Sequence, residues 1–370
     1  MTSFTVAPKI LQMNSCKEML KYFEIGSGDL FITSHHAMDG LIPCISGAEI
    51  VYLRDFGEGE PTDSMVEAIY QSLSGKSFER VIAMGGGSVL DVGKLFCLKE
   101  IFPVNDLFNG NIKPVRNKKL IMVPTTCGTG SEVTDISVLE LTALNTKKGL
   151  AVQELYADYA VLIPELLEKL PFSIFAASSI DAFIHCVESY LSPKANSFIR
   201  MYSIEGIKII LNGYIKIARE DSRARFPLLA DFLTASTYAG ISFGNAGCAA
   251  VHALSYPLGA TYHIPHGESN YALLAGVLEK YKELKPSGDL DSLECLFSKI
   301  LGCEKTRAIT KLNACLNNMI PKKALREYGI KESELEVFTK SVIETQQRLL
   351  SNNYIRFTYD DILEIYKNLY

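Results

Sequence analysis

Residues 80–98 read Arg-Val-Ile-Ala-Met-Gly-Gly-Gly-Ser-Val-Leu-Asp-Val-Gly-Lys-Leu-Phe-Cys-Leu. The stretch begins with an apolar run that is typical of a buried strand, and the residues from Ser88 onward have the spacing of a helix. A strand followed by glycines and then by a helix is the opening half of a parallel β-α-β unit. This stretch therefore predicts a parallel sheet with helices on its faces.

The same alternation continues on both sides of this stretch. Further apolar runs predict strands over residues 29–33, 49–53 and 119–123. Apolar residues four positions apart predict a helix over 61–73. Residues 135–141 and 147–152 predict a β-hairpin laid on the sheet.

The pattern changes after Pro171, where strand signals nearly vanish. Helical spacing covers residues 173–191, 197–218, 225–243, 271–284 and 333–350. Thr358 and Asp361 resemble a capping box before one more helix. We therefore expect two domains: an α/β domain with a Rossmann-like parallel sheet over residues 1–171, and an all-α domain over residues 172–370.

Composition restricts the classes of function. A chain of 370 residues fits two domains. Its net charge is −5 and no basic block occurs, so we expect no nucleic-acid partner. No apolar run reaches the ~18 residues of a membrane span, and the N-terminus lacks a signal-peptide pattern. The nine cysteines lack any Cys-x-x-Cys pair, which favours reduced thiols and a cytoplasmic protein.

The glycine turn after residue 84 has the features of an anion site. Gly86 and Gly87 let a ligand approach the backbone, and the following helix N-terminus offers free N–H groups. Ser88 is a candidate N-cap, with Asp91 three residues on as a capping carboxylate. A plain tight turn is the alternative interpretation.

A second loop, Pro124-Thr-Thr-Cys-Gly-Thr-Gly-Ser-Glu132, also follows an apolar run and holds four hydroxyl groups. Ligands of open α/β sheets bind at the carboxyl ends of the strands. Two polar loops after two successive strands therefore favour a dinucleotide site over simple turns.

The helical half contains a possible metal site. Asp181 and His185 lie one helical turn apart on one face. His252 and His266 are 14 residues apart, and the prolines at 257 and 265 predict that they lie on different segments. Three imidazoles and one carboxylate suit Fe²⁺ or Zn²⁺ rather than Ca²⁺ or Mg²⁺. Taken singly, each histidine is better explained as structural. Glu188 fits either a partner of a ligand or a solvated residue.

Taken in order, these motifs resemble the iron-containing (group III) alcohol dehydrogenase family, and the resemblance covers the whole chain. Within that family the chain looks most like the 4-hydroxybutyrate dehydrogenases, an impression to which residues 325–329 and 341–350 add. The resemblance implies a dehydroquinate synthase-like architecture, NAD as cofactor and one divalent metal, Fe²⁺ or Zn²⁺. It implies interconversion of 4-hydroxybutyrate and succinate semialdehyde by metal-assisted hydride transfer, in a homodimer or larger homo-oligomer.

The resemblance also carries residue roles. It implies metal ligation by Asp181, His185, His252 and His266. It implies NAD contacts from Gly86, Gly87, Ser88, Thr125, Thr126, Thr129, Thr134 and Val138. The family also places a hairpin lysine at the cofactor, and the spacing to the following strand favours Lys148 over Lys147.

Three positions depart from the family pattern. Tyr256 stands where many members carry a histidine, so His263 becomes the predicted catalytic proton carrier, with bulk water as the alternative. Ser34 stands where relatives often have the Asp that selects NAD over NADP, which leaves that choice open, and Glu60 replaces a common Asn.

Other functions remain open at this point. A butanol or propanediol dehydrogenase would use the same residues. A dehydroquinate synthase-like lyase would use NAD and metal without net NADH, and an inactive NAD-binding protein would keep the ligands without turnover.

Overall fold

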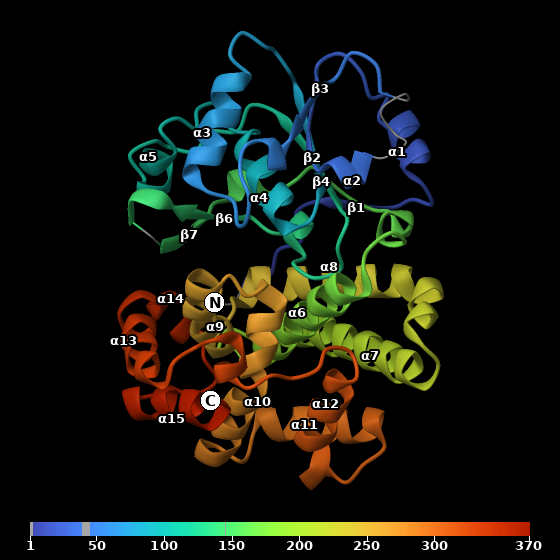
Figure 1. Ribbon diagram of the computed structural model, residues 1–370. Coiled ribbons are helices and arrows are strands. Elements are labelled where there is room, and N and C mark those ends of the chain that lie inside the picture. The colour runs from blue at the N-terminus through green and yellow to red at the C-terminus, as the bar shows by residue number, and fades with distance from the viewer. Residues whose placement is uncertain (1–2, 39–44, 145) are drawn as a thin grey trace. The chain divides into compact units, whose positions relative to one another are not determined.

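A computed structural model describes residues 3–38, 45–144 and 146–370 (Figure 1). The chain divides into two compact units, one of residues 6–170 and the other of residues 171–370 together with the segment that ends at Thr5. In that segment, Phe4 stacks on Phe198 with ring centroids 5.3 Å apart. The backbone N–H of Thr5 donates to Oδ1 of Asn245 at 2.7 Å. These contacts place residues that were expected in the α/β domain with the helical unit.

The first unit is built on a parallel sheet. Its strands are β1 (Lys9–Gln12), β2 (Asp29–Thr33), β3 (Glu49–Tyr52), β4 (Arg80–Gly85), β5 (Lys119–Pro124) and β8 (Tyr159–Leu162), in the order β1-β8-β5-β4-β2-β3. All five strand pairings are parallel. The α/β class and four of these strands were predicted, whereas β1 and β8 were not.

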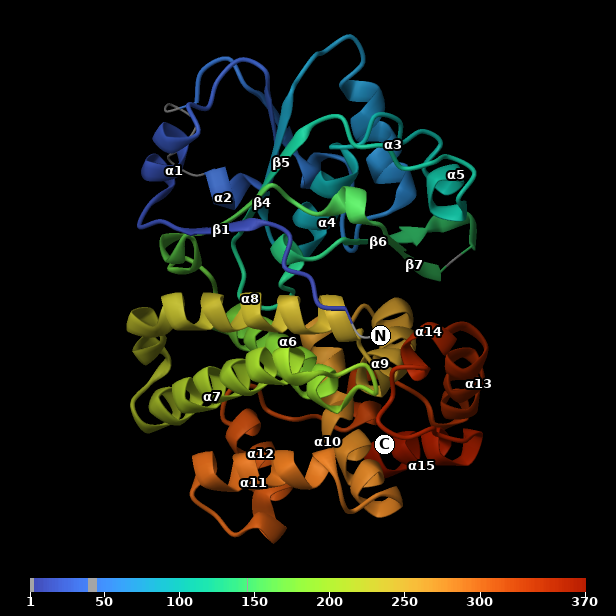
Figure 2. The ribbon, with the colours of Figure 1, turned by 180° about the vertical axis from the view of Figure 1, so that it is seen from behind.

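Helices cover both faces of the sheet (Figures 1 and 2). The side chains along each strand point alternately to the two faces and so enter two different cores. Leu30 and Ile32 of β2 belong to one apolar core, whereas Phe31 belongs to the other. The unit's helices are α1 (Cys16–Tyr22), α2 (His35–Met38), α3 (Asp63–Ser72), α4 (Gly87–Leu95) and α5 (Val104–Asn109). Residues of α3, α4 and α5 line the first core and residues of α1 line the second.

The predicted hairpin consists of β6 (Ile136–Leu141) and β7 (Thr146–Ala151), which pair antiparallel. It forms a separate two-stranded sheet and does not extend the main one. β6 packs against α4, which carries the glycine turn at its start. The hairpin is therefore attached to the helix that was expected to bind the cofactor.

The second unit is helical in the described residues from 171 onward. Its helices are α6 (Phe172–Leu191), α7 (Ser197–Arg219), α8 (Leu229–Ala246), α9 (Ala250–Tyr262), α10 (His266–Leu284), α11 (Asp289–Leu301), α12 (Ala308–Asn317), α13 (Leu335–Thr345), α14 (Gln347–Leu350) and α15 (Tyr359–Leu369). The all-α character was predicted, and Thr358 and Asp361 do form the capping box of α15. Helices α9, α11 and α12 were not predicted.

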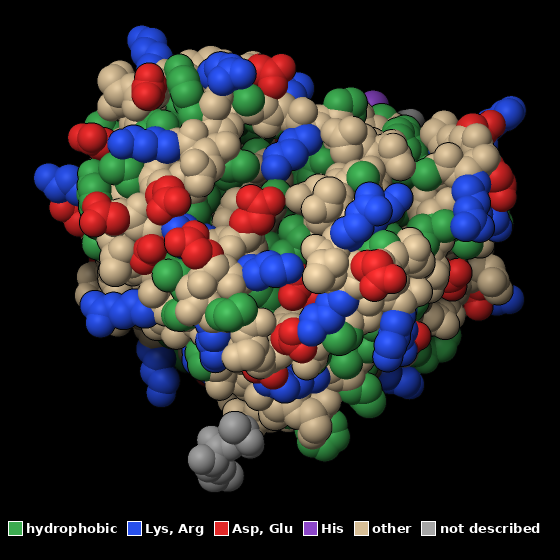
Figure 3. All heavy atoms as spheres, turned by 90° about the horizontal axis from the view of Figure 1, so that it is seen from below, with side chains coloured by type: hydrophobic (Ala, Val, Ile, Leu, Met, Phe, Trp, Pro, Cys, Tyr) green, Lys and Arg blue, Asp and Glu red, His purple; other side chains and the backbone are tan. Residues whose placement is uncertain are grey.

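The surface of the helical unit is mixed in charge on the face drawn in Figure 3, where Lys and Arg side chains alternate with Asp and Glu. Ion pairs of this unit include Lys305 with Asp291 and Lys280 with Glu364. Across the described residues, none of the helices combines the length and the apolar character that crossing a bilayer demands.

Candidate active site

The predicted metal ligands of the helical unit come together. Helix α6 carries Asp181 and His185, α9 carries His252, and α10 begins at His266. Nε2 of His252 lies 3.0 Å from Nε2 of His185 and 3.7 Å from Oδ1 of Asp181. Nε2 of His266 lies 3.8 Å from the same carboxylate oxygen. Donor atoms from three helices therefore lie close together, with His252 near both His185 and Asp181.

The prediction that His252 and His266 lie on different segments is confirmed, because His252 lies on α9 and His266 begins α10. Pro257 lies inside α9, so the chain breaks only at residues 263–265. A side chain at Gly267 would place its Cβ 2.1 Å from the carbonyl oxygen of Ala177 on α6. Because position 267 is glycine, the start of α10 can approach α6 closely and bring His266 to Asp181.

Glu188 is buried against the predicted ligand His252 and is not a solvated residue. Its buried carboxylate accepts hydrogen bonds from the backbone N–H groups of Ala249 and Val251, at 2.9 and 2.6 Å. It also lies 2.6 Å from Nδ1 of His252. A carboxylate at Nδ1 fixes the proton there and leaves Nε2 as the donor that faces the cluster.

Asn270 is a site residue that the sequence analysis missed. Its Nδ2 donates to Oδ1 of Asp181 at 2.8 Å and lies 3.2 Å from Nε2 of His266. The Ser255 hydroxyl donates in turn to Oδ1 of the Asn270 side chain. The available signal was its position four residues after His266, on the same helical face.

Charges within the cluster determine its ionisation. Burial opposes ionisation of Asp181, but His185, His266 and His252 outweigh it and lower the pKa of this carboxyl. Burial likewise lowers the pKa of His252, but Cys248 and Glu188 outweigh it and raise that pKa well above its ordinary value.

The donor set fits a divalent metal ion. It combines imidazole nitrogens with one ionised carboxylate, a set that Fe²⁺ and Zn²⁺ accept. Nδ1 of the buried His185 makes no hydrogen bond with the described part of the chain. Such an unsatisfied buried nitrogen is uncommon unless the site has a ligand.

The predicted proton carrier lies outside this cluster. His263 is exposed and ends α9 with a left-handed φ of 53°. Tyr256, which stands at the family's histidine position, has its ring 6.3 Å from that of His266. Burial raises the pKa of Tyr256, so its hydroxyl stays protonated at neutral pH.

The cofactor residues of the α/β unit gather at the carboxyl ends of β4 and β5. Gly85 pairs with Pro124, and the N–H of Thr125 donates to the Gly85 carbonyl at 3.0 Å. Gly86 faces Thr126 and Gly87 faces Thr129, while Ser88 lies in the first turn of α4. The N-cap is Gly86 and not Ser88, because the helix begins at Gly87, two residues before a helix capped by Ser88 would begin. The first N–H groups of α4 thus have no side-chain cap.

Asp91 has a different role from the predicted capping one. Its Oδ1 accepts from Ser131 at 2.5 Å and its Oδ2 accepts from the N–H of Val138 at 3.0 Å. The buried Lys94 donates to Thr134 Oγ1 at 3.0 Å and to Ser131 Oγ at 2.7 Å. Asp91 and Lys94 of α4 therefore fix the positions of the threonine-rich loop, of Thr134 after it and of Val138 in the hairpin. Thr134 and Val138 are both predicted NAD contacts.

The hairpin register bears on the choice of lysine. Glu140 lies opposite Lys147, and Leu139 lies opposite Lys148. Because side chains alternate along a strand, Lys147 shares its face with Val138, whereas Lys148 shares the face of the buried Leu139. Lys147 contacts Glu60 at 3.3 Å, and Lys148 donates to Asn109 at 2.8 Å.

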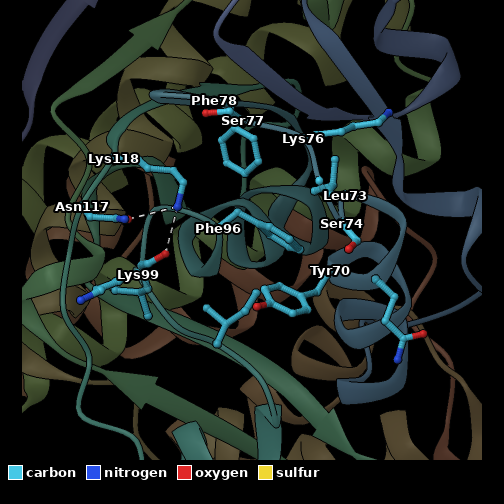
Figure 4. A pocket seen from close by; sticks show the side chains of 14 residues that line it. Tyr70, Leu73, Ser74, Lys76, Ser77, Phe78, Phe96, Lys99, Asn117 and Lys118 are labelled. Carbon is cyan, nitrogen blue, oxygen red and sulfur yellow. Dashed lines mark hydrogen bonds between the residues drawn. The ribbon is translucent and has the colours of Figure 1, made fainter.

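A cavity of about 710 Å³ lies elsewhere in the α/β unit (Figure 4). Residues just before β4 and β5 line it, among them Phe78 and Lys118, whose Nζ sits 5.0 Å from the Phe78 ring centre. The cavity is therefore at the amino ends of the strands, opposite the glycine turn. No predicted site residue is among those that line it.

The fold and donor set together define a class of protein. Residues 10–164 match the family model for iron-containing alcohol dehydrogenase, and residues 175–370 match that for the C-terminal part of the same family. The chain belongs to the iron-containing alcohol dehydrogenase family. This assignment confirms the predicted enzyme class and favours a dehydrogenase over a lyase.

Individual relatives can be placed beside the chain. The 4-hydroxybutyrate dehydrogenase of Clostridium kluyveri is 45% identical, over 99% of this chain and 99% of its own length. The long-chain-alcohol dehydrogenase 1 of Geobacillus thermodenitrificans is 36% identical, over 83% of this chain and 78% of its own. Among solved structures, an iron-containing alcohol dehydrogenase from Thermotoga maritima has a TM-score of 0.79 at 25% identity and covers 100% of this chain and 99% of its own.

Proposed function

We propose that the chain is an NAD-dependent 4-hydroxybutyrate dehydrogenase, which interconverts 4-hydroxybutyrate and succinate semialdehyde. The observation that carries the proposal is the 45% identity, over nearly the full length of both chains, with the Clostridium kluyveri enzyme of that name. The converging donors of Asp181, His185, His252 and His266 support it, because that family is iron-containing.

The four donors would hold one divalent ion, Fe²⁺ or Zn²⁺. When bound, such an ion supplies Lewis acidity, which favours the alkoxide of an alcohol and polarises the carbonyl of an aldehyde. Glu188 holds His252 in the tautomer with Nε2 facing the cluster, and Asn270 orients the carboxylate of Asp181. His266 is the most open donor, with a third of its side chain exposed.

The α/β unit would bind NAD through Gly86, Gly87 and Ser88 and through the hydroxyls of Thr125, Thr126 and Thr129. Uncapped N–H groups at the start of α4 suit a pyrophosphate. Thr134 follows the threonine-rich loop, and Val138 lies in β6 of the hairpin. For the lysine we now propose Lys147 in place of Lys148, because the register puts it on the face of Val138.

Proton exchange with solvent is proposed for His263, whose side chain is exposed. Tyr256, at the family's histidine position, keeps its proton because burial raises its pKa. We also propose a cytoplasmic homodimer or larger homo-oligomer. All eight described cysteines are free thiols, which is the state that a reducing compartment maintains.

The test is NADH oxidation with succinate semialdehyde beside butyraldehyde, on protein loaded anaerobically with Fe²⁺. We expect a strong preference for the semialdehyde in kcat/KM. Equal or better turnover of butyraldehyde would reject the substrate and leave a general alcohol dehydrogenase.

Two variants accompany the test. His266→Ala should stay folded while losing metal and turnover, because it removes one donor and leaves α10 in place. Full activity in that variant would reject the metal assignment. His263→Gln should lower kcat, and an unchanged kcat would reject its role in proton exchange.

A further inference from the structure

Cys248 lies beside the metal ligands, although neither its spacing nor the family motifs singled it out. It immediately precedes Ala249, the N-cap of α9. Its sulfur lies within 4.8 Å of donor nitrogens of His185 and His252, and the three side chains form a group that could hold a metal ion. Cys248 as a residue is half-buried.

The helical unit thus contains two overlapping donor groups. Asp181, His252 and His266 form one, with nitrogen and oxygen donors. His185, Cys248 and His252 form the other, with nitrogen and sulfur donors. His252 belongs to both, and Nδ1 of the buried His185 has no hydrogen-bond partner among the described residues. A cation can therefore sit nearer the carboxylate or nearer the sulfur.

We propose that Cys248 is a sulfur ligand that joins His185 and His252 to bind thiophilic divalent ions such as Zn²⁺ and Cd²⁺. The inference rests on the metal centre of the proposed function and extends it to metal selectivity. It states that the chain holds a harder donor set that suits Fe²⁺ and a softer one that draws Zn²⁺.

Geometry and ligand chemistry support this assignment. Two donors bound to one tetrahedral zinc ion, at bonds of about 2.0–2.3 Å, lie roughly 3.5 Å apart. The Nε2 atoms of His185 and His252 are 3.0 Å apart, close to that separation. Thiolate ligands favour Zn²⁺, whereas a carboxylate accepts Fe²⁺ readily. Binding replaces the S–H bond by a sulfur–metal bond and releases one proton to solvent, with no change in oxidation state.

The experiment compares wild type with Cys248→Ser, after chelation and reloading with Co²⁺ under anaerobic conditions. Cys303→Ser is the matched control, because Cys303 is also partly exposed and lies outside the donor groups. We expect a thiolate-to-cobalt charge-transfer band in the near ultraviolet for wild type and for the control. Cys248→Ser should lack that band.

A second measurement covers the case in which the serine variant folds poorly. Wild type equilibrated with equal Zn²⁺ and Fe²⁺ should retain mainly Zn²⁺, and Zn²⁺ should protect Cys248 from alkylation, as read by peptide mass spectrometry. In folded Cys248→Ser the Zn²⁺-to-Fe²⁺ ratio should fall by about tenfold, the order seen when a partner of a metal site is lost.

A persistent band in Cys248→Ser, or a thiol that alkylates equally with and without Zn²⁺, would overturn the proposal. These readouts do not depend on turnover. A failure of the substrate assignment would appear only in the aldehyde preference of the Fe²⁺-loaded wild type, so the two failures are distinguishable.

Discussion

Glu188 shows how much of the metal centre depends on one buried side chain. Its carboxylate lies one turn beyond His185 on α6, yet it contacts the start of α9 by two backbone N–H groups and His252 by the imidazole. One residue therefore sets both the position of α9 and the tautomer of a ligand. We therefore expect loss of its charge to lower the affinity for the metal while the fold is kept.

We predict that Glu188→Gln lowers metal affinity by roughly 10–100-fold, the usual cost of losing a carboxylate that supports a ligating histidine. The amide keeps the shape and can still accept from a backbone N–H, so the circular dichroism spectrum should not change. Competition with a chelator measures the affinity. Glu205→Gln on α7, an exposed carboxylate, is the control. Equal metal retention in both variants would show that Glu188 is merely structural.

At the scale of elements, the start of α4 packs so closely against the threonine-rich loop that one position leaves no space for a side chain. A Cβ at Gly87 would lie 2.7 Å from Cγ2 of Thr129, whereas a Cβ at Gly86 would lie 3.5 Å from Cγ2 of Thr126. The first distance forces a shift, and the second is ordinary contact. Neighbouring glycines thus differ in their tolerance of a methyl group.

We predict that Gly87→Ala raises the dissociation constant for NAD by about tenfold or more, because overpacking costs about 1–3 kcal/mol. Gly86→Ala should have a smaller effect. Isothermal titration with NAD checks both. A larger loss for Gly86→Ala would mean that ligand contact, and not packing against Thr129, decides the position.

Asp63 joins three elements of the α/β unit. It starts α3, accepts from the N–H of Thr142 at 3.2 Å after the hairpin's first strand, and accepts from Asn105 of α5 at 2.9 Å. Burial raises the pKa of this carboxyl, but the hydrogen bonds from Thr142, Asn105 and Ser64 outweigh it and lower the pKa below 3.8.

The lowered pKa makes the stabilising effect of Asp63 depend on pH. The ionised form is favoured by folding, so its contribution is complete above the unfolded pKa of 3.8 and is lost as pH falls through the folded value. We predict that Asp63→Asn lowers the free energy of unfolding by about 1–2 kcal/mol at pH 7. The difference from wild type should shrink as the pH falls below about 4.

Urea unfolding followed by circular dichroism at several pH values measures this difference. Asp360→Asn, an exposed carboxylate on α15, should leave the midpoint nearly unchanged at every pH. A constant difference between Asp63→Asn and wild type over the acid range would refute the assigned role of ionisation.

Particular elements show what the sequence can predict. Strands β2, β4 and β5 are apolar runs buried on both faces, and such runs are visible without any partner. β1 has four residues and is mostly exposed, so its pattern carries no signal. The separation of α9 from α10 was predicted from Pro257 and Pro265, but Pro257 is accommodated within α9 and the break falls at residues 263–265. Local pattern could not decide these cases.

The candidate site divides in the same way. Asp181 and His185 share a helical face, so the sequence alone pairs them. Asn270 shares a face of α10 with the predicted ligand His266. Cys248 lies in the segment before α9, and only tertiary packing brings it to the cluster. Asp91 resembled a helix cap, but its carboxylate instead accepts long-range hydrogen bonds from Ser131 and from the N–H of Val138.

At the scale of the whole molecule, each compact unit contains one set of ligand-binding residues. The proposed NAD contacts lie within residues 6–170, and the metal donors lie within residues 171–370. A ligand that binds only the folded form stabilises the segment that holds it. Each ligand should therefore leave its own local signature.

We predict that NAD slows amide hydrogen exchange chiefly in residues 85–95 and 124–134. Fe²⁺ should slow exchange chiefly in 181–188, 249–254 and 266–270. Exchange measured by mass spectrometry with each ligand alone tests this, and removal of iron by a chelator should reverse the second pattern. Equal protection of α4 by either ligand would contradict separate binding sets.

The contact between Thr5 and Asn245 also has a consequence for how the protein is made. These partners are 240 residues apart, and residues 6–170 between them form a unit of their own. A ribosome releases Phe4 and Thr5 long before α8 exists, so the α/β unit can fold while this segment still waits for its partner. A fusion tag placed before Phe4 would then be attached to the helical unit, which carries the proposed metal donors, although the next residues along the chain belong to the α/β unit.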